Sequence, residues 1–157
     1  KTKEQALKVL AARSRDNSRT PMQWSDDKNA GFTEGTPWIE APENYKEINA
    51  ETELKDPDSI YSFYKKLIAL RKEKDIIAEE TIEFLEKENA DVLAYRRNYQ
   101  GEELIVLNNL TAENVTIRQQ PEWKVYQKRL GNYEKITAED GKITLRPFET
   151  IVLDSAL

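Results

Sequence analysis

The chain has 157 residues, of which 38% are hydrophobic and 34% are charged, and its formal net charge is −5. This length fits one ordinary domain or a small domain with a docked appendage, and the composition predicts a modest core beneath a heavily charged surface. The absence of cysteine and histidine excludes a disulfide framework and a thiolate metal site and removes the usual general base near neutral pH, so we expect no metal and no cofactor.

The chain opens with a short helical pattern from Lys1 to Arg13, which lacks an N-cap signature. This abrupt beginning suggests that the chain was cut from a longer protein. Between Ser14 and Lys55 we predict neither helix nor strand, and a loop of this length is usually functional or disordered. Disordered segments are poor in aromatic residues, whereas this one contains four, so we expect an ordered surface loop: Trp24, Phe32, Trp38 and Tyr45.

The stretch from Arg15 to Trp24 is the densest in hydrogen-bonding groups, and it has no helical or strand periodicity. An arginine fork suits the recognition of carboxylates or paired hydroxyls, so Arg15 and Arg19 are candidate binding residues. Ion pairs with Asp16 or with upstream acids are the alternative for both arginines. Trp24, Trp38 and Tyr45 could stack on sugar rings, but burial beneath the loop is the more common fate of such aromatics, and we expect it here.

The clearest predicted helix opens at Asp56-Pro57-Asp58-Ser59 and ends near Asp75, with Asp56 as its cap and Pro57 at its first position. Cationic residues occupy its last turn, where the helix dipole favours them. Its apolar residues form one stripe at helical spacing, which we expect to be buried against a substantial partner: Ile60, Phe63, Tyr64, Leu67, Ile68 and Leu70.

From Thr81 onward the hydrophobic period changes to two. Seven short strands at this spacing predict a small antiparallel sandwich: Thr81–Glu86, Val92–Asn98, Leu104–Asn109, Val115–Arg118, Trp123–Lys128, Lys142–Leu145 and Thr150–Leu153. The run from Leu104 to Leu107 is continuously apolar, so we expect it to be the central strand. The predicted class is α+β, with an irregular loop and a helix followed by an all-β sandwich.

No catalytic set is recognisable within these residues. The adjacent acids Asp26-Asp27, Glu79-Glu80 and Glu102-Glu103 are predicted to lie on a solvated surface. There is no nucleophile-elbow motif and no phosphate-binding glycine loop. No basic face favours nucleic acid, and no apolar run approaches the ~20 residues of a membrane span. We therefore expect no nucleic-acid or membrane partner and a cytoplasmic location.

Four segments of the chain closely resemble the C-terminal part of glycoside hydrolase family 13 enzymes, the oligo-1,6-glucosidases and trehalose-6-phosphate hydrolases among them: Arg15–Trp24, Asn29–Phe32, Gly35–Ile39 and Asn44–Asn49. The stretch Tyr64–Arg71 resembles the last helix of their (β/α)8 barrel. The resemblance implies that residues 1–77 are the end of the catalytic barrel and that residues 78–157 form a C-terminal β-sandwich domain.

The resemblance also implies an exo-acting, retaining α-glucosidase whose three catalytic carboxylates lie upstream of this chain. None of them maps here, so we expect the chain alone to be inactive. In the family, an arginine of the opening motif reaches the bottom of the glucose pocket, where it pairs with an upstream aspartate and contacts the substrate. The resemblance assigns this role to Arg19 first and to Arg15 second. The partner implied is the upstream barrel.

Two other readings and the choice of substrate stay open. A free-standing carbohydrate-binding module requires exposed coplanar aromatics on one sandwich face, and five residues are candidates: Tyr95, Tyr99, Trp123, Tyr126 and Tyr133. An interaction domain would associate as a homodimer through the exposed helix stripe. The parent substrate is open among isomaltose-type oligosaccharides, a dextran end and trehalose 6-phosphate, and a sucrose isomerase parent is also open.

Overall fold

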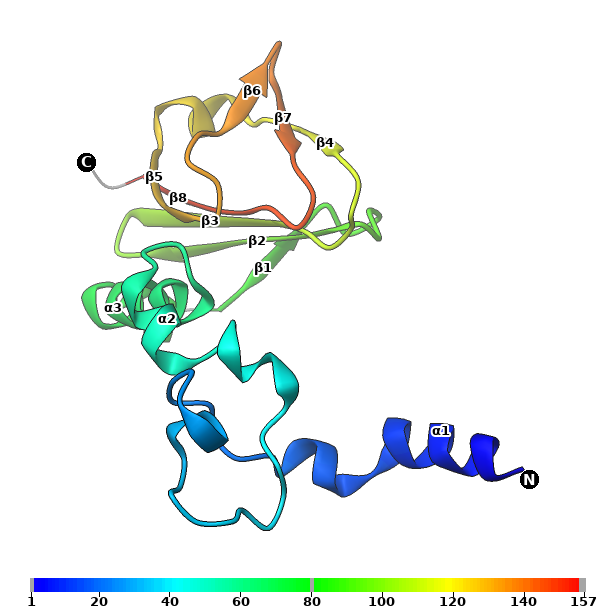
Figure 1. Ribbon diagram of the computed structural model, residues 1–157. Helices are drawn as coiled ribbons and strands as arrows, with labels where there is room; N and C mark the ends of the chain where they lie inside the picture. Colours follow the sequence, from blue (N-terminus) through cyan, green and yellow to red (C-terminus); the bar gives the residue numbers. More distant parts are fainter. Residues whose placement is uncertain (1, 80, 156–157) are drawn as a thin grey trace. The chain divides into compact units, whose positions relative to one another are not determined.

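The computed structural model describes residues 2–79 and 81–155, and it divides into two compact units, Lys1–Ser62 and Phe63–Leu157. Figure 1 traces the chain through both units. Of the sequence predictions, the first residue of the opening helix and Glu80 of one acidic pair lie outside the described residues. No helix in the described ranges is long and apolar enough to cross a membrane.

The first unit consists of short helical segments joined by turns: α1 (Lys3–Arg13), η1 (Arg15–Ser18), η2 (Lys28–Gly31), η3 (Glu43–Lys46), α2 (Ala50–Lys55) and the start of α3 (Ile60–Glu73). The prediction that the segment from Ser14 to Lys55 lacks helix is therefore wrong. Its helical pieces are too short to produce a hydrophobic period, and two are set by local capping. Asn49 caps α2 by accepting a 3.0 Å hydrogen bond from the Thr52 amide.

Two predicted helix starts are also corrected. Thr2 caps α1 in a capping box with Gln5, whose amide lies 3.3 Å from the Thr2 hydroxyl, so an N-cap signature is present after all. Ser59 occupies the predicted role of Asp56, because the Ser59 hydroxyl accepts a 3.1 Å hydrogen bond from the Ser62 amide. Asp56 instead closes the preceding turn by accepting a 2.8 Å bond from the Asp58 amide.

The second unit is an antiparallel β-sandwich with α3 and the short helix α4 (Ile76–Glu79), which confirms the predicted fold class. Its strands are β1 (Glu83–Leu85), β2 (Val92–Tyr99), β3 (Glu102–Asn109), β4 (Val115–Arg118), β5 (Gln127–Gly131), β6 (Thr137–Glu139), β7 (Lys142–Leu145) and β8 (Thr150–Asp154). One sheet has the order β1-β2-β3-β8-β5 and the other the order β4-β7-β6. The two layers are visible in Figure 1.

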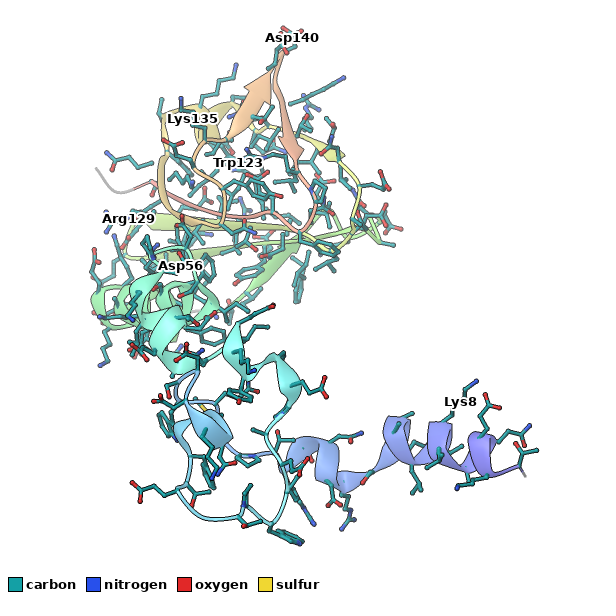
Figure 2. The ribbon with its side chains drawn as sticks, viewed as in Figure 1. Lys8, Asp56, Trp123, Arg129, Lys135 and Asp140 are labelled. Carbon is teal, nitrogen blue, oxygen red and sulfur yellow. The ribbon has the colours of Figure 1, made fainter. Side chains whose placement is uncertain are left out.

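The strand predicted from Trp123 to Lys128 is wrong in its first half. Pro121–Val125 forms a 3-10 helix, η4, with a proline at its start, and β5 begins only at Gln127. Strand β6 was not predicted, because its three residues are all exposed and carry no alternating pattern. Trp123, in η4, is 5% exposed and belongs to the core between the sheets. Asp140 lies at the tip of the β6–β7 hairpin (Figure 2).

Both faces of the five-stranded sheet are covered. Its inner face packs against the three-stranded sheet through a cluster that includes Ile105, Leu107 and Ile143. Its outer face carries a second cluster, in which Leu104, Val106 and Val152 contact α3 and α4 residues. Strand β3 therefore contributes to both clusters and lies in the middle of its sheet, which confirms the prediction for Leu104–Leu107.

The apolar stripe of α3 divides between two surroundings. Phe63, Leu67 and Leu70 pack into the cluster on the outer face of the sheet. Ile60 is 73% exposed, and Tyr64 and Ile68 are 61% and 52% exposed. The expected burial of the stripe is thus confirmed for one side of the helix and wrong for the other, because the sheet covers only one side of a helix.

Candidate functional site

The arginine-rich stretch opens on η1, whose shape is set by local hydrogen bonds. The Ser14 hydroxyl accepts a 3.2 Å bond from the Asp16 amide, and the Ser18 hydroxyl donates a 2.9 Å bond to the Arg15 carbonyl. The Asn17 side chain donates a 2.6 Å bond back to the Ala11 carbonyl. These bonds use the small polar residues of the motif to shape the backbone and leave both arginine side chains exposed.

The two arginines have different surroundings. Arg19 lies 3.8 Å from Asp16, and the two side chains are 50% and 58% exposed. An exposed pair at this distance contributes little to stability. The ion pair with Asp16 therefore does not explain why an arginine is present at position 19. For Arg15, no ion pair occurs within residues 2–79 and 81–155. Both guanidinium groups are therefore available to an acceptor outside the described chain.

The segment after the arginines is folded back on itself by backbone hydrogen bonds. The Ala30 carbonyl accepts bonds from the amides of Trp24 and Ser25 at 2.8 and 3.2 Å. Asn29 and Ala30 both have positive φ, 57° and 59°, a conformation that is costly for alanine. Gly31 has a φ of 65°, and a Cβ there would lie 2.6 Å from the Ser25 hydroxyl oxygen.

The folded-back segment is joined to α2. The amides of Ala50 and Glu51 donate to the carbonyls of Gln23 and Trp24 at 2.9 and 3.0 Å. The Gln23 side chain donates a 2.5 Å bond to the Ile48 carbonyl. The loop that follows the arginines is thus a turn framework built from hydrogen bonds and not from apolar packing.

The expected burial of the loop aromatics is wrong for two of three residues. Trp24 is 53% exposed and Trp38 is 85% exposed, while Tyr45 is half-buried. Among the described residues of the first unit only Ala30, Asn49 and Ser59 are buried. This unit builds no apolar core of its own, so its large side chains lack a surface to pack on.

The acidic pairs do not form a catalytic site. Asp26, Asp27 and Glu79 are exposed, as predicted. The prediction of a solvated surface is wrong for Glu102 and Glu103, because the first pairs with Lys74 and the second accepts a 2.7 Å bond from the Tyr126 hydroxyl.

Successive residues of a strand point to opposite faces, so the two carboxylates of the Glu102-Glu103 pair cannot act together. Burial, and then the bond to Glu103, raises the pKa of Tyr126 to about 12. In the described ranges no three acidic side chains converge as metal ligands would.

The five aromatics of the carbohydrate-binding alternative do not form an exposed face. Trp123 is buried, and the four tyrosines are half-buried. Tyr126 packs on the inner core, while Tyr95 and Tyr99 pack on the cluster at the outer face of the sheet. The Tyr133 ring lies beneath Arg146, 4.0 Å from the guanidinium carbon. The sandwich therefore lacks the aromatic platform that this alternative requires.

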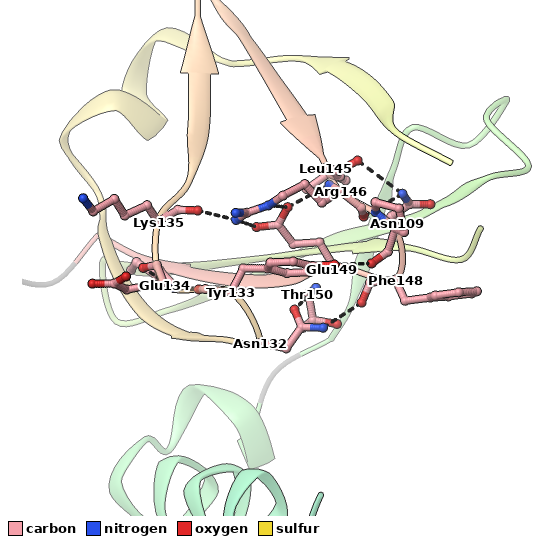
Figure 3. A network of polar contacts seen from close by, with 12 residues as sticks. Asn109, Asn132, Tyr133, Glu134, Lys135, Leu145, Arg146, Phe148, Glu149 and Thr150 are labelled. Carbon is pink, nitrogen blue, oxygen red and sulfur yellow. Dashed lines mark hydrogen bonds and ion pairs between the residues drawn. The ribbon is translucent and has the colours of Figure 1, made fainter. Parts of the chain in front are cut away.

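At one end of the sandwich a polar network replaces apolar packing (Figure 3). Glu149 is 1% exposed and accepts bonds from the Arg146 guanidinium at 2.7 and 3.0 Å. The Asn109 side chain donates to the carbonyls of Arg146 and Leu145 at 2.8 and 3.2 Å. Sequence reasoning missed this network because Asn109 lies far along the chain from Arg146 and Glu149. The local signal was an arginine and a glutamate three residues apart, just before a strand.

Comparison with known proteins gives two family matches. Residues 1–80, just over half of the chain, match the family described as "Alpha amylase, catalytic domain". Residues 92–152 match the family described as "Alpha-amylase SusG C-terminal domain". The two matches follow one another along the chain, as the resemblance of the opening motifs implied.

Individual relatives agree with the family matches. The oligo-1,6-glucosidase of Parageobacillus thermoglucosidasius is 41% identical over 95% of this chain and 27% of its own length. The trehalose-6-phosphate hydrolase of Bacillus subtilis is 45% identical over 92% of this chain and 26% of its own length. The crystal structure of Bacillus licheniformis trehalose-6-phosphate hydrolase superposes with a TM-score of 0.87 at 40% identity, covering 98% of this chain and 28% of that one.

The chain spans about a quarter of the length of these relatives. The catalytic-domain match contains the arginine motif and α3, and the second match contains most of the sandwich. The chain therefore belongs to the alpha-amylase family, glycoside hydrolase family 13.

Proposed function

We propose that the chain is the C-terminal part of an exo-acting, retaining α-glucosidase that hydrolyses α-glucosidic bonds in oligosaccharides or in trehalose 6-phosphate. The observation that carries this proposal is the match of residues 1–80 to the alpha-amylase catalytic domain. The chain covers only 27% of the length of the oligo-1,6-glucosidase relative. The described residues contain no catalytic carboxylate pair, so the 157 residues are inactive alone. The activity belongs to the longer protein.

Within that protein, residues 1–77 are the end of the catalytic barrel and residues 78–157 are the C-terminal β-sandwich domain. The exposed Trp24 and Trp38 support this assignment, because a segment with large exposed apolar side chains and almost no core needs a partner surface. The upstream barrel is that partner. Glucosides are the substrate class, as the names of the relatives suggest.

Arg19, and after it Arg15, is the proposed substrate-binding residue. Its side chain is half-exposed and its guanidinium lies 3.8 Å from Asp16, so it can donate to a sugar hydroxyl and to an upstream carboxylate. A guanidinium suits both acceptors, because it presents several N–H groups in one plane.

The test is an Arg19→Ala substitution in the full-length enzyme, assayed with p-nitrophenyl α-glucoside. A hydrogen bond from a charged donor is worth about 1.5–3 kcal/mol, so kcat/KM should fall by about 10- to 150-fold. Arg15→Ala should have a smaller effect, and Arg118→Ala, at an exposed position of β4, should have none. Equal activities of the Arg15, Arg19 and Arg118 variants would refute a substrate contact by this motif.

We also propose that the 157-residue chain on its own forms a homodimer through the exposed side of α3. The observation that favours this is the row Ile60, Tyr64 and Ile68, each more than half exposed and spaced by one helical turn. Sedimentation velocity at increasing concentration should reveal the dimer. An Ile68→Ser variant that associates equally well would contradict it.

A further inference from the structure

A chain of alternating charges lies where the end of α3 meets the outer face of the five-stranded sheet. The Asp154 carboxylate, at the end of β8, is 2.9 Å from the Lys74 ammonium and 3.4 Å from the Arg129 guanidinium. Lys74 also pairs with Glu102 of β3, and Arg129 of β5 also pairs with Glu73 of α3. Five charged groups from one helix end and three strands therefore form one connected network, which we call the α3 ion cluster.

Asp154 is the member on which this cluster depends. Its side chain is fully buried, whereas those of Lys74, Arg129 and Glu73 are 14%, 31% and 58% exposed. A buried carboxylate is stable only when cations and donors surround it. Two cations contact the Asp154 carboxylate, Lys74 at 2.9 Å and Arg129 at 3.4 Å.

The α3 ion cluster joins two segments that match different families. Glu73 and Lys74 lie within residues 1–80, the catalytic-domain match, while Glu102 and Arg129 lie within residues 92–152, the C-terminal-domain match. The apolar cluster on the outer face of the sheet also takes residues from both segments. Leu70 and Ile76 come from the first segment, and the remaining buried members come from the second. The end of the first segment, from Phe63 onward, and the whole of the second segment belong to one compact unit.

We propose that Asp154 is a positioning residue that locks α3, the last long helix of the catalytic-domain segment, onto the C-terminal sandwich. The joint between the two family segments is then a fixed core and not a flexible link. The ion cluster fixes the placement of α3 on the sheet. Apolar packing is non-directional, whereas the 2.9 Å and 3.4 Å contacts of Lys74 and Arg129 with Asp154 require both cations to stay where they are. This inference goes beyond the proposed function and does not depend on it.

The test is amide hydrogen exchange on the whole 157-residue chain carrying Asp154→Asn. Local opening raises exchange only in the element that opens. Amides of residues 64–73 should therefore exchange about tenfold faster or more, while amides in the β2–β3 ladder keep their wild-type rates within about twofold. Asp140→Asn makes the same chemical change at an exposed hairpin tip and should alter neither region.

A second variant guards against loss of folding in Asp154→Asn. Arg129→Gln removes the more distant and more exposed cation while Lys74 stays on Asp154, so it should raise α3 exchange by a smaller factor, about threefold. Equal acceleration of α3 and of the β2–β3 ladder in either folded variant would mean a general loss of stability and would overturn the proposal. Unchanged α3 exchange in Arg129→Gln and Asp154→Asn would overturn it as well.

Discussion

The ion pair between the buried Glu149 and the partly exposed Arg146 allows a sharp prediction about the stability of the sandwich. Glu149→Gln keeps the shape of the side chain but removes its charge and turns one acceptor into a donor that faces the guanidinium. Three bonds are affected, from the Arg146 amide at 2.8 Å and from its guanidinium at 2.7 and 3.0 Å. The bond to Glu149 is also the main reason that the pKa of Arg146 is raised.

The expected loss is large. A hydrogen bond to a charged group is worth about 1.5–3 kcal/mol, and domains of this size are stable by about 5–15 kcal/mol. Urea denaturation of the 157-residue chain, followed by circular dichroism, should show a midpoint shift of this size with an unchanged slope. Glu139→Gln is the control, because it makes the same substitution on the exposed strand β6.

Two outcomes would refute the reasoning. One is a loss of less than about 1 kcal/mol, which is the range of a surface pair. The other is additive effects of Glu149→Gln and Arg146→Met in a double-mutant cycle, since two contacting partners of one ion pair must show coupling.

Three further predictions concern the core, the pH response and the loop. Leu107→Ala, at a fully buried position between the sheets, should cost about 2–5 kcal/mol in urea denaturation, whereas Leu93→Ala, at a 41% exposed position, should cost far less. The pKa of Tyr126 is raised from its ordinary value of 10.0 to about 12. The contribution of the Tyr126 hydroxyl to stability should therefore be complete below pH 10.0 and be lost as the pH rises through about 12. In pH-dependent denaturation, Tyr126→Phe should abolish this part of the loss of stability at alkaline pH. Limited proteolysis should cut between residues 14 and 55 before it cuts the sandwich, since the described first unit has three buried residues, and early cleavage within β3 would contradict this.

The parts of the fold that follow local rules could be predicted from the sequence. The period of 3.6 in α3 and the period of 2 in the strands each indicate one buried face, and β3 is apolar on both faces because it is covered on both. Strand β6 and the 3-10 helices could not be predicted, because segments of three to five residues are too short to show a period. Ser59 took the capping role predicted for Asp56 because both are good caps and their competition is decided by the fold.

The candidate site was predicted less completely than the fold. Arg15 and Arg19 are candidates because arginine side chains in an irregular polar segment indicate a recognition function, and their role in binding stays a prediction. The exposure of Trp24 and Trp38 could not, because burial depends on partner surfaces that a local pattern does not contain. The same holds for Glu102 and Glu103, whose partners Lys74 and Tyr126 lie more than twenty residues away.

The most direct test of the central claim compares the hydrolysis of p-nitrophenyl α-glucoside by the 157-residue chain and by the full-length product of the same gene. The account predicts turnover by the full-length protein and none by the chain alone, because the described residues contain no catalytic carboxylate pair. Turnover by the 157 residues alone would contradict the account, and it would mean that acidic groups assigned here to the surface or to ion pairs form an active site.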